Sequence, residues 1–100
     1  MSSTQQEAVA EKVTVKGPNK YQVIFLNDNV TPMDYVVQCL VTIFGKTAEE
    51  SKDITIEVHE KGRSIAGIYS YEVAEQKCIE TVTDARTNGF PLDVIMEEQA

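Results

Sequence analysis

The sequence predicts an α+β sandwich in which a three-stranded sheet is packed by helices on one side, with the element order β-α-α-β-α-β. Three observations support this fold class. Short runs rich in β-branched and aromatic residues occur near the start of the folded region, in its middle and at its end. The longer stretches between them begin with helix-capping signatures. Glycines at positions 45, 62 and 89 follow these stretches, where helices would end.

The first strand is expected at residues 21–26, ahead of a polar turn at residues 27–29. Residues 1–20 are mostly Ser, Thr, Gln, Glu, Lys and Ala without a periodic apolar face, so burial cannot offset the entropy of ordering them. We therefore expect a flexible N-terminal extension over residues 1–20 and a core domain over residues 21–100.

A first helix is expected after the polar turn. Thr31 is the predicted N-cap, Pro32 occupies the first helical position, and Asp34 reaches back as in a capping box. Gly45 ends the helix. Its expected buried face comprises Val36, Val37, Leu40, Val41 and Phe44.

The next segment, over residues 47–62, carries two conflicting signals. The capping signature at Thr47 and the stop at Gly62 favour one helix over about residues 48–60. Apolar residues that alternate with polar ones over residues 54–59 indicate a strand instead. The local pattern leaves both interpretations open.

A second strand, a long helix and a short third strand complete the fold. The strand is expected at residues 64–69, and Ser70 can cap the helix that follows. Residues 88–91, Asn-Gly-Phe-Pro, end this helix, and alternation over residues 92–96 indicates the third strand. The inward stripe of the long helix is expected to comprise Tyr71, Ala74, Cys78, Val82 and Ala85.

Composition and charge exclude several classes of protein. A chain of 100 residues is one domain, and its net charge of −7 would repel nucleic acid and anionic lipid. No apolar run approaches the about 18–20 residues that span a bilayer, and residues 1–20 lack the apolar core of a secretion signal. One histidine and the widely separated Cys39 and Cys78 offer no zinc-ligand cluster. We expect a cytoplasmic monomer with reduced cysteines that uses no metal, cofactor, nucleic acid or membrane.

The loop between the first strand and the first helix is the main candidate for a polar site. It places Asp28 close to a helix N-terminus, where the carboxylate would stay ionised and attract a cation. The alternative is an Asx turn followed by a capped helix, which requires no ligand. His59 is the only imidazole in the chain, and a surface or structural role is the alternative to a role in a site.

Three stretches resemble one known family. Residues 27–36, N-D-N-V-T-P-M-D-Y-V, are similar to the N-D-D-x-T-P-M-[DE]-[FY]-V signature of the ClpS adaptors. Residues 58–62 (V-H-x-x-G) and 67–77 (G-I-Y-x-x-E-V-A-E-x-K) match further parts of the family pattern in the same order. The resemblance covers about residues 21–97, the whole predicted folded region.

The resemblance implies a fold, a function and a partner. The fold would be a three-stranded antiparallel sheet packed by three helices, similar to the carboxy-terminal domain of ribosomal protein L7/L12, with a helix at residues 54–59. The chain would be a non-catalytic adaptor for N-degron substrates, which begin with a bulky hydrophobic residue (Phe, Leu, Tyr or Trp). It would deliver them to a ClpA- or ClpC-type AAA+ unfoldase, which works with ClpP.

By the same resemblance, Asn27, Asp28 and His59 would bind the free α-amino group of the substrate. An ammonium group has three donors and one positive charge, so acceptors and a carboxylate suit it. The first side chain would enter an apolar pocket beside these groups. Its expected lining is Leu26, Thr31, Met33, Val36, Thr55 and Val58.

The family's unfoldase-docking surface corresponds to Glu72 and Lys77 on the last helix, for which a solvated helix face is the alternative. Two positions depart from the commoner pattern. Asn29 stands where a second Asp is usual, which removes a negative charge near the ammonium. Thr55 stands where Met is frequent, and its smaller, more polar side chain is expected to enlarge the pocket or to alter its preference.

Two other functions fit parts of the pattern. One is a non-catalytic docking domain of the L7/L12 type with a different partner, which would need neither an amine site nor a pocket. The other is a small acid/base enzyme that uses Asp28 and His59, for which the chain offers no nucleophile or metal.

Overall fold

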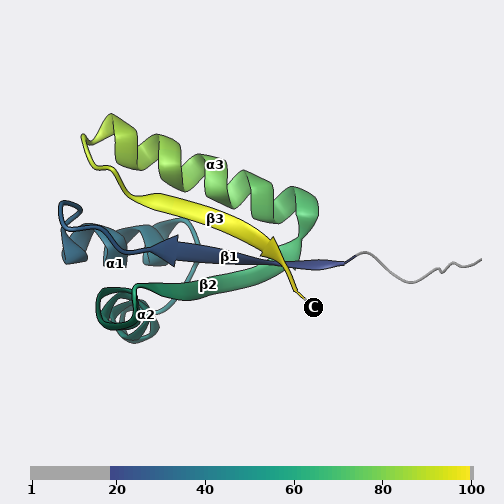
Figure 1. Cartoon of the computed structure of the whole chain (residues 1–100), viewed down its shortest axis with the longest axis horizontal. Helices are drawn as coiled ribbons and strands as arrows, with labels where there is room; N and C mark the ends of the chain where they lie inside the picture. The colour runs from purple at the N-terminus through teal and green to yellow at the C-terminus, as the bar shows by residue number, and fades with distance from the viewer. Residues whose placement is uncertain (1–18, 100) are drawn as a thin grey trace, which may run out of the picture.

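The computed structural model describes residues 19–99 and confirms the expected α+β fold (Figure 1). The expected extension over residues 1–20 lies outside the described residues up to residue 18, and the first strand already includes Lys20. The elements in chain order are β1 (Lys20–Leu26), α1 (Met33–Thr42), α2 (Ala48–Lys61), β2 (Arg63–Ser70), α3 (Tyr71–Thr87) and β3 (Asp93–Glu98).

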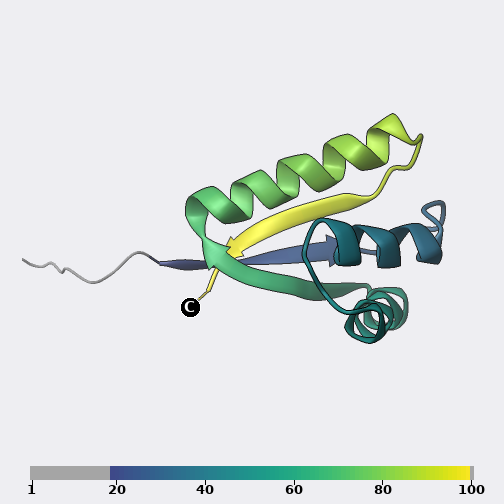
Figure 2. The same ribbon diagram turned by 180° about the vertical axis from the view of Figure 1, so that it is seen from behind.

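The strands form one antiparallel sheet in the order β2-β1-β3, with β1 in the centre. Seen from behind, α1 lies in front of the end of β1, with α2 near the start of β2 and α3 alongside β3 (Figure 2). Residues of all three helices pack in one core with Val23 and Phe25 of β1, so the helices cover one face of the sheet. None of the helices within residues 19–99 is long and apolar enough to cross a membrane.

The core lies between the central strand and the helices. Val23 and Phe25 of β1 are fully buried there, and the ring of Phe25 meets that of Phe44 edge-on with centroids 5.3 Å apart. Burying side chains of this size stabilises the fold by about 1.5–3 kcal/mol each. The core therefore anchors β1, and β1 leads directly into the polar loop.

Local capping signals decide the ambiguous segment in favour of a helix. Thr47 and Glu50 form a reciprocal capping box at the start of α2, with both hydrogen bonds at 3.0 Å. Gly62 ends α2 in the left-handed conformation, with φ of 90°. The strand interpretation of residues 54–59 is therefore wrong, because these caps outweigh the alternating pattern.

The expected start of α1 is displaced by one residue. Pro32 is the N-cap in an extended conformation, with ψ of 143°, and Met33 is the first helical residue. Thr31 does not cap the helix, because its hydroxyl donates to the Asp28 carboxylate at 2.8 Å. The Thr31 side chain, which the sequence predicted to cap α1, thus forms part of the polar loop instead.

The buried faces of α1 and α3 differ partly from the expected ones. In α1, Tyr35 and Cys39 are buried whereas Val41 is 38 % exposed. In α3, Tyr71 is 51 % exposed and Thr81 is fully buried, because its hydroxyl donates to the Lys77 carbonyl at 2.7 Å. A polar side chain that is satisfied within its own helix can replace an apolar one in the core.

Candidate functional site

The carboxylate of Asp28 organises the loop between β1 and α1. Its Oδ1 accepts hydrogen bonds from the backbone N–H groups of Val30 at 2.8 Å and Thr31 at 2.6 Å. Its Oδ2 accepts from the Thr31 hydroxyl at 2.8 Å. This is the Asx turn that the sequence offered as the alternative to a ligand site, and it still leaves acceptor capacity on Oδ2 for a further donor.

Opposing effects set the pKa of Asp28. Partial burial raises it, whereas the hydrogen bonds from the backbone of Thr31 and Val30, the Thr31 hydroxyl and the charge of Arg86 lower it. The net effect is a pKa below the ordinary value of 3.8. The side chain is therefore a carboxylate at neutral pH, although it lies at the edge of an apolar cavity.

A backbone hydrogen bond connects this loop to the end of α2. The Asn27 N–H donates to the Gly62 carbonyl at 2.9 Å, and Leu26 pairs with Arg63 at the start of β2. His59 lies on the last turn of α2, where its side chain is exposed. The sheet register thus brings the imidazole to the polar loop from more than thirty positions away in the sequence.

The loop, α1 and α2 enclose one cavity with about 270 Å³ of atom-free space, part of it open to solvent. The portion wide enough for a water molecule is about 20 Å³, close to the space that one water needs. The structure brings all nine residues expected for the amine site and the pocket to this cavity. They are Leu26, Asn27, Asp28, Thr31, Met33, Val36, Thr55, Val58 and His59.

Leu92 also lines the cavity, and the sequence did not indicate this role. It lies between α3 and β3 and is only 1 % exposed. It reaches the cavity although it is far in the sequence from the other lining residues. Arg86 holds this segment in place by donating to the carbonyls of Phe90 at 3.1 Å and Leu92 at 2.7 Å and by pairing with Asp93 at 2.9 Å. No local spacing links residues 86–93 to the polar loop, so the sequence carried no signal for them.

The cavity wall formed by α2 contains one hydroxyl group, that of Thr55. Thr55 is 3 % exposed, and its Oγ1 donates to the Ser51 carbonyl at 2.7 Å. Ser51, one turn earlier, is fully buried, and its hydroxyl has no hydrogen-bond partner within residues 19–99. Thr55 is therefore a buried polar group in the lining of the cavity, whereas Ser51 lies behind it and does not line the cavity.

The arrangement suits a ligand with a cationic donor group next to an apolar side chain. Asn27 and His59 are exposed at the mouth beside the Asp28 carboxylate, whereas Val36 and Val58 are buried inside. An amide oxygen, a carboxylate and an imidazole nitrogen can each accept from an ammonium group. Within the described residues, no three His, Cys, Asp or Glu side chains gather as metal ligands would.

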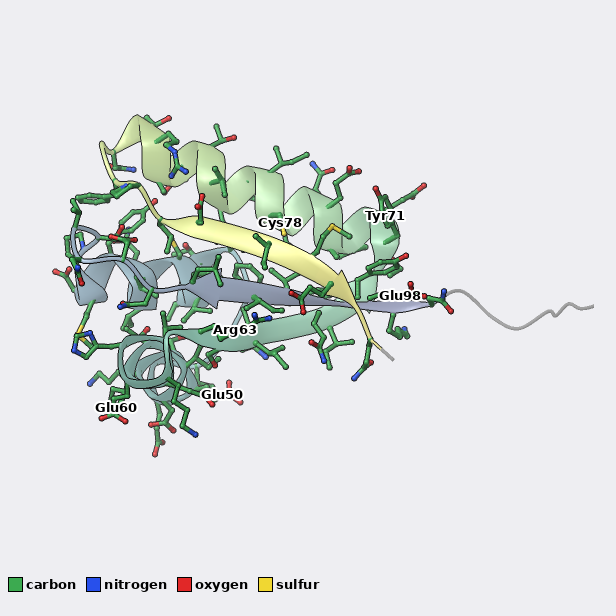
Figure 3. All side chains as sticks on the ribbon, viewed as in Figure 1. Glu50, Glu60, Arg63, Tyr71, Cys78 and Glu98 are labelled. Carbon is green, nitrogen blue, oxygen red and sulfur yellow. The ribbon has the colours of Figure 1, made fainter. Side chains whose placement is uncertain are left out.

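Glu72 and Lys77 lie away from the cavity. The start of α3 is at the opposite end of the sheet from the polar loop, where Figure 3 shows Tyr71. Glu72 is exposed, whereas Lys77 is half-buried and its Nζ donates to the Ile43 carbonyl at 2.6 Å. Lys77 also lies 5.7 Å from the centroid of the Phe44 ring. Glu72 therefore points to solvent, whereas Lys77 is bonded to the residue that follows α1.

Fold and cavity together define a small α+β binding domain. A family model described as ATP-dependent Clp protease adaptor protein ClpS matches residues 16–95. The chain therefore belongs to the ClpS family of adaptor proteins of the ATP-dependent Clp protease. The resemblance seen in the sequence is confirmed, and the family selects the adaptor interpretation over a docking domain of the L7/L12 type.

Individual relatives support the same conclusion. The ClpS adapter protein of Treponema denticola is 44 % identical over 81 residues, which cover 81 % of this chain and 80 % of the relative. That of Wolinella succinogenes is 41 % identical over 90 residues, covering 90 % and 88 %. The structure of Agrobacterium tumefaciens ClpS2 bound to L-phenylalaninamide is similar with a TM-score of 0.81 and 26 % identity, covering 83 % of this chain and all of that one.

Proposed function

We propose that this chain binds the free α-amino group and the bulky hydrophobic first side chain of N-degron substrates and delivers them to the Clp protease. The observation that carries the proposal is the convergence of Asn27, Asp28 and His59 on the mouth of one apolar cavity. L-Phenylalaninamide, the ligand of the Agrobacterium relative, is itself a free amine attached to a benzyl side chain.

The proposed site distinguishes a free α-amino group from an acetylated one by its charge and by its number of hydrogen-bond donors. Asp28 already accepts three hydrogen bonds from its own loop, so its position does not depend on the ligand. An ammonium group adds a charge-assisted bond to the remaining acceptor capacity of Oδ2. An acetylated amine has lost the charge and two of the donors, so it would leave acceptors unsatisfied at about 1–3 kcal/mol each.

The proposed pocket accepts one large side chain once its opening widens. The space available in this structure is about that of one water molecule, which is smaller than any aromatic ring. Met33, 44 % exposed at the mouth, is the wall residue best able to move, because its unbranched thioether has several rotatable bonds. Val36, Val58 and Leu92 are buried and form the fixed walls.

The start of α3 is the proposed surface for a ClpA- or ClpC-type unfoldase. Lys20 pairs with Ser70, so the backbone that leads into β1 emerges next to Glu72. The ring of Tyr21 meets the exposed ring of Tyr71 edge-on at 5.2 Å. An unfoldase docked at Glu72 could therefore also reach Asn19 and Lys20.

Fluorescence anisotropy with two labelled peptides tests the proposal. One peptide begins with a free Phe, and the other is the same peptide with its amino group acetylated. We expect binding of the first and, because both the charge and the donors are lost, at least tenfold weaker binding of the second. Equal affinity for both peptides, or no binding of either, would contradict the proposed function.

A further inference from the structure

The hydroxyl group of Thr55 is a polar feature of the cavity that amine binding does not use. It lies on the buried inner wall formed by α2, one helical turn before His59 at the mouth. Four residues of α-helix rise about 6 Å, which is the scale on which a phenol ring extends from its own Cα. A side chain whose amino group is held at the mouth would therefore place the far end of its ring near Thr55.

The donor and acceptor capacities of this hydroxyl are not equally available. Its proton is committed, because Oγ1 donates to the Ser51 carbonyl at 2.7 Å within the same helix. The lone pairs of Oγ1 remain, so Thr55 presents an acceptor and no donor to the cavity. The buried residues around it, Val36, Val58 and Leu92, have apolar side chains.

We propose that the Thr55 hydroxyl makes this adaptor prefer a first residue with a hydrogen-bond donor at the tip of its ring, tyrosine above phenylalanine. This inference rests on the proposed function, since it assumes that the first side chain enters this cavity. The tyrosine O–H would donate to Oγ1 of Thr55. Without an acceptor there, burying that O–H would disfavour tyrosine relative to phenylalanine.

Phenylalanine remains a ligand under this proposal. Because the Thr55 proton already has a partner in Ser51, a phenyl ring leaves no buried donor unsatisfied. Discrimination is then limited to one neutral hydrogen bond. We expect tyrosine to bind about 3- to 10-fold more tightly than phenylalanine.

The test compares peptides that differ only in a first Tyr or Phe, measured by anisotropy on the full chain and on three variants. Thr55→Val keeps the shape of the side chain and removes the acceptor, so we expect it to reverse the preference between the two peptides. Thr55→Ser retains the hydroxyl and should retain the tyrosine preference. Ser51→Ala removes the buried hydroxyl one turn away and should leave the preference unchanged, because Ser51 does not line the cavity.

Other outcomes separate this inference from the proposed function. Equal affinity for both peptides in the unaltered chain would overturn the inference and leave the function intact. Equal weakening of both peptides by Thr55→Val would also overturn it, because a packing defect would then explain the loss. Failure of both free-amine peptides to bind the unaltered chain would overturn the proposed function itself.

Discussion

The phenol of Tyr35 on α1 donates a hydrogen bond to the carboxylate of Asp84 on α3. The Tyr35 ring also packs on Phe90, with centroids 4.8 Å apart. These contacts connect the helix that begins at the polar loop with the segment that carries Leu92 into the cavity. Tyr35 thus helps to fix the position of α1 relative to the segment that contains Leu92, and these are two sides of the proposed site.

We expect Tyr35→Phe to lower the free energy of unfolding by about 1–2 kcal/mol, because the bond to a charged acceptor is lost while the ring contact remains. Urea denaturation at neutral pH measures the change. Tyr71→Phe is the matched control, since this tyrosine is half exposed, and its effect should stay within about 0.5 kcal/mol. Equal effects of the two changes would assign no special role to the Tyr35 bond.

Alkaline pH should destabilise the fold. Burial raises the pKa of the Cys39 and Cys78 thiols above their ordinary value of 9.0 and that of Tyr35 and Tyr69 above 10.0. Above pH 9.0 the unfolded chain therefore loses protons that the folded chain keeps. Since the folded state then binds more protons, the contribution of these groups to stability is constant below this pH and falls above it, by up to about 1.4 kcal/mol per pH unit for each group.

Urea denaturation with a reducing agent, repeated on both sides of pH 9.0, checks this expectation. Cys39→Ala removes one of the responsible groups, so its stability should depend less steeply on pH in the alkaline range. An unchanged pH dependence in this variant would exclude the Cys39 thiol as a cause.

The features predicted correctly from residues alone are those set by neighbours in the chain. The cap at Thr47 and the stop at Gly62 are set within one helical turn and could be read from the residues, although the alternation at residues 54–59 left helix and strand open until the family resemblance favoured the helix. The burial of Tyr35 in place of Val41 depends instead on a partner in α3, forty-nine positions away. No local pattern contains that information.

The candidate site likewise combines features set by neighbours in the chain with features set by distant residues. The Asx turn of Asp28 is readable from the sequence, because its donors lie two and three residues further along. The approach of His59 depends on the pairing of β1 with β2, and only the family resemblance supplied it. Leu92 and its support from Arg86 depend on the path of the chain after α3, so sequence reasoning missed both.

Replacing Asp28 should separate binding from loop stability. Asp28→Asn keeps an oxygen that can accept from the Val30 and Thr31 N–H groups but removes the charge, so we expect at least tenfold weaker binding of a free-amine peptide. Asp28→Ala also removes the acceptors and should cost about 1–2 kcal/mol of stability. Anisotropy and urea denaturation on both variants provide the comparison, and unchanged binding by Asp28→Asn would remove Asp28 from the proposed amine site.

Acid should weaken the same loop. The folded-state pKa of Asp28 is lowered, so its contribution to stability is present above the ordinary value of 3.8 and is lost as the pH falls through the folded value. The Asp28→Asn variant should show a smaller loss of stability than the unaltered chain when both are brought below pH 3.8. Parallel losses in the two proteins would show that other carboxylates determine the acid response.

Lys77 and Glu72 should respond differently to neutralisation. Lys77→Met removes the bond to the Ile43 carbonyl at the end of α1 and the charge beside Phe44, so we expect a loss of about 1–2 kcal/mol. Glu72→Gln changes an exposed side chain and should alter stability by no more than about 0.5 kcal/mol. If both variants weaken unfoldase binding, only the effect of Glu72→Gln indicates direct contact. Equal stability of the two variants would contradict the structural role of Lys77.

Ser51→Ala should stabilise the protein, which is unusual for a change at a fully buried position. The Ser51 hydroxyl has no hydrogen-bond partner within residues 19–99, so the folded state carries the desolvation cost of an unsatisfied polar group. Alanine removes that group and has the higher helix propensity, and together these effects should raise the free energy of unfolding by about 1 kcal/mol. Urea denaturation gives the difference, with Thr55→Val as the comparison, because Thr55 loses a hydrogen bond that is present in the fold. A loss of stability in Ser51→Ala would contradict this expectation, because it would mean that the Ser51 hydroxyl contributes favourably to the fold.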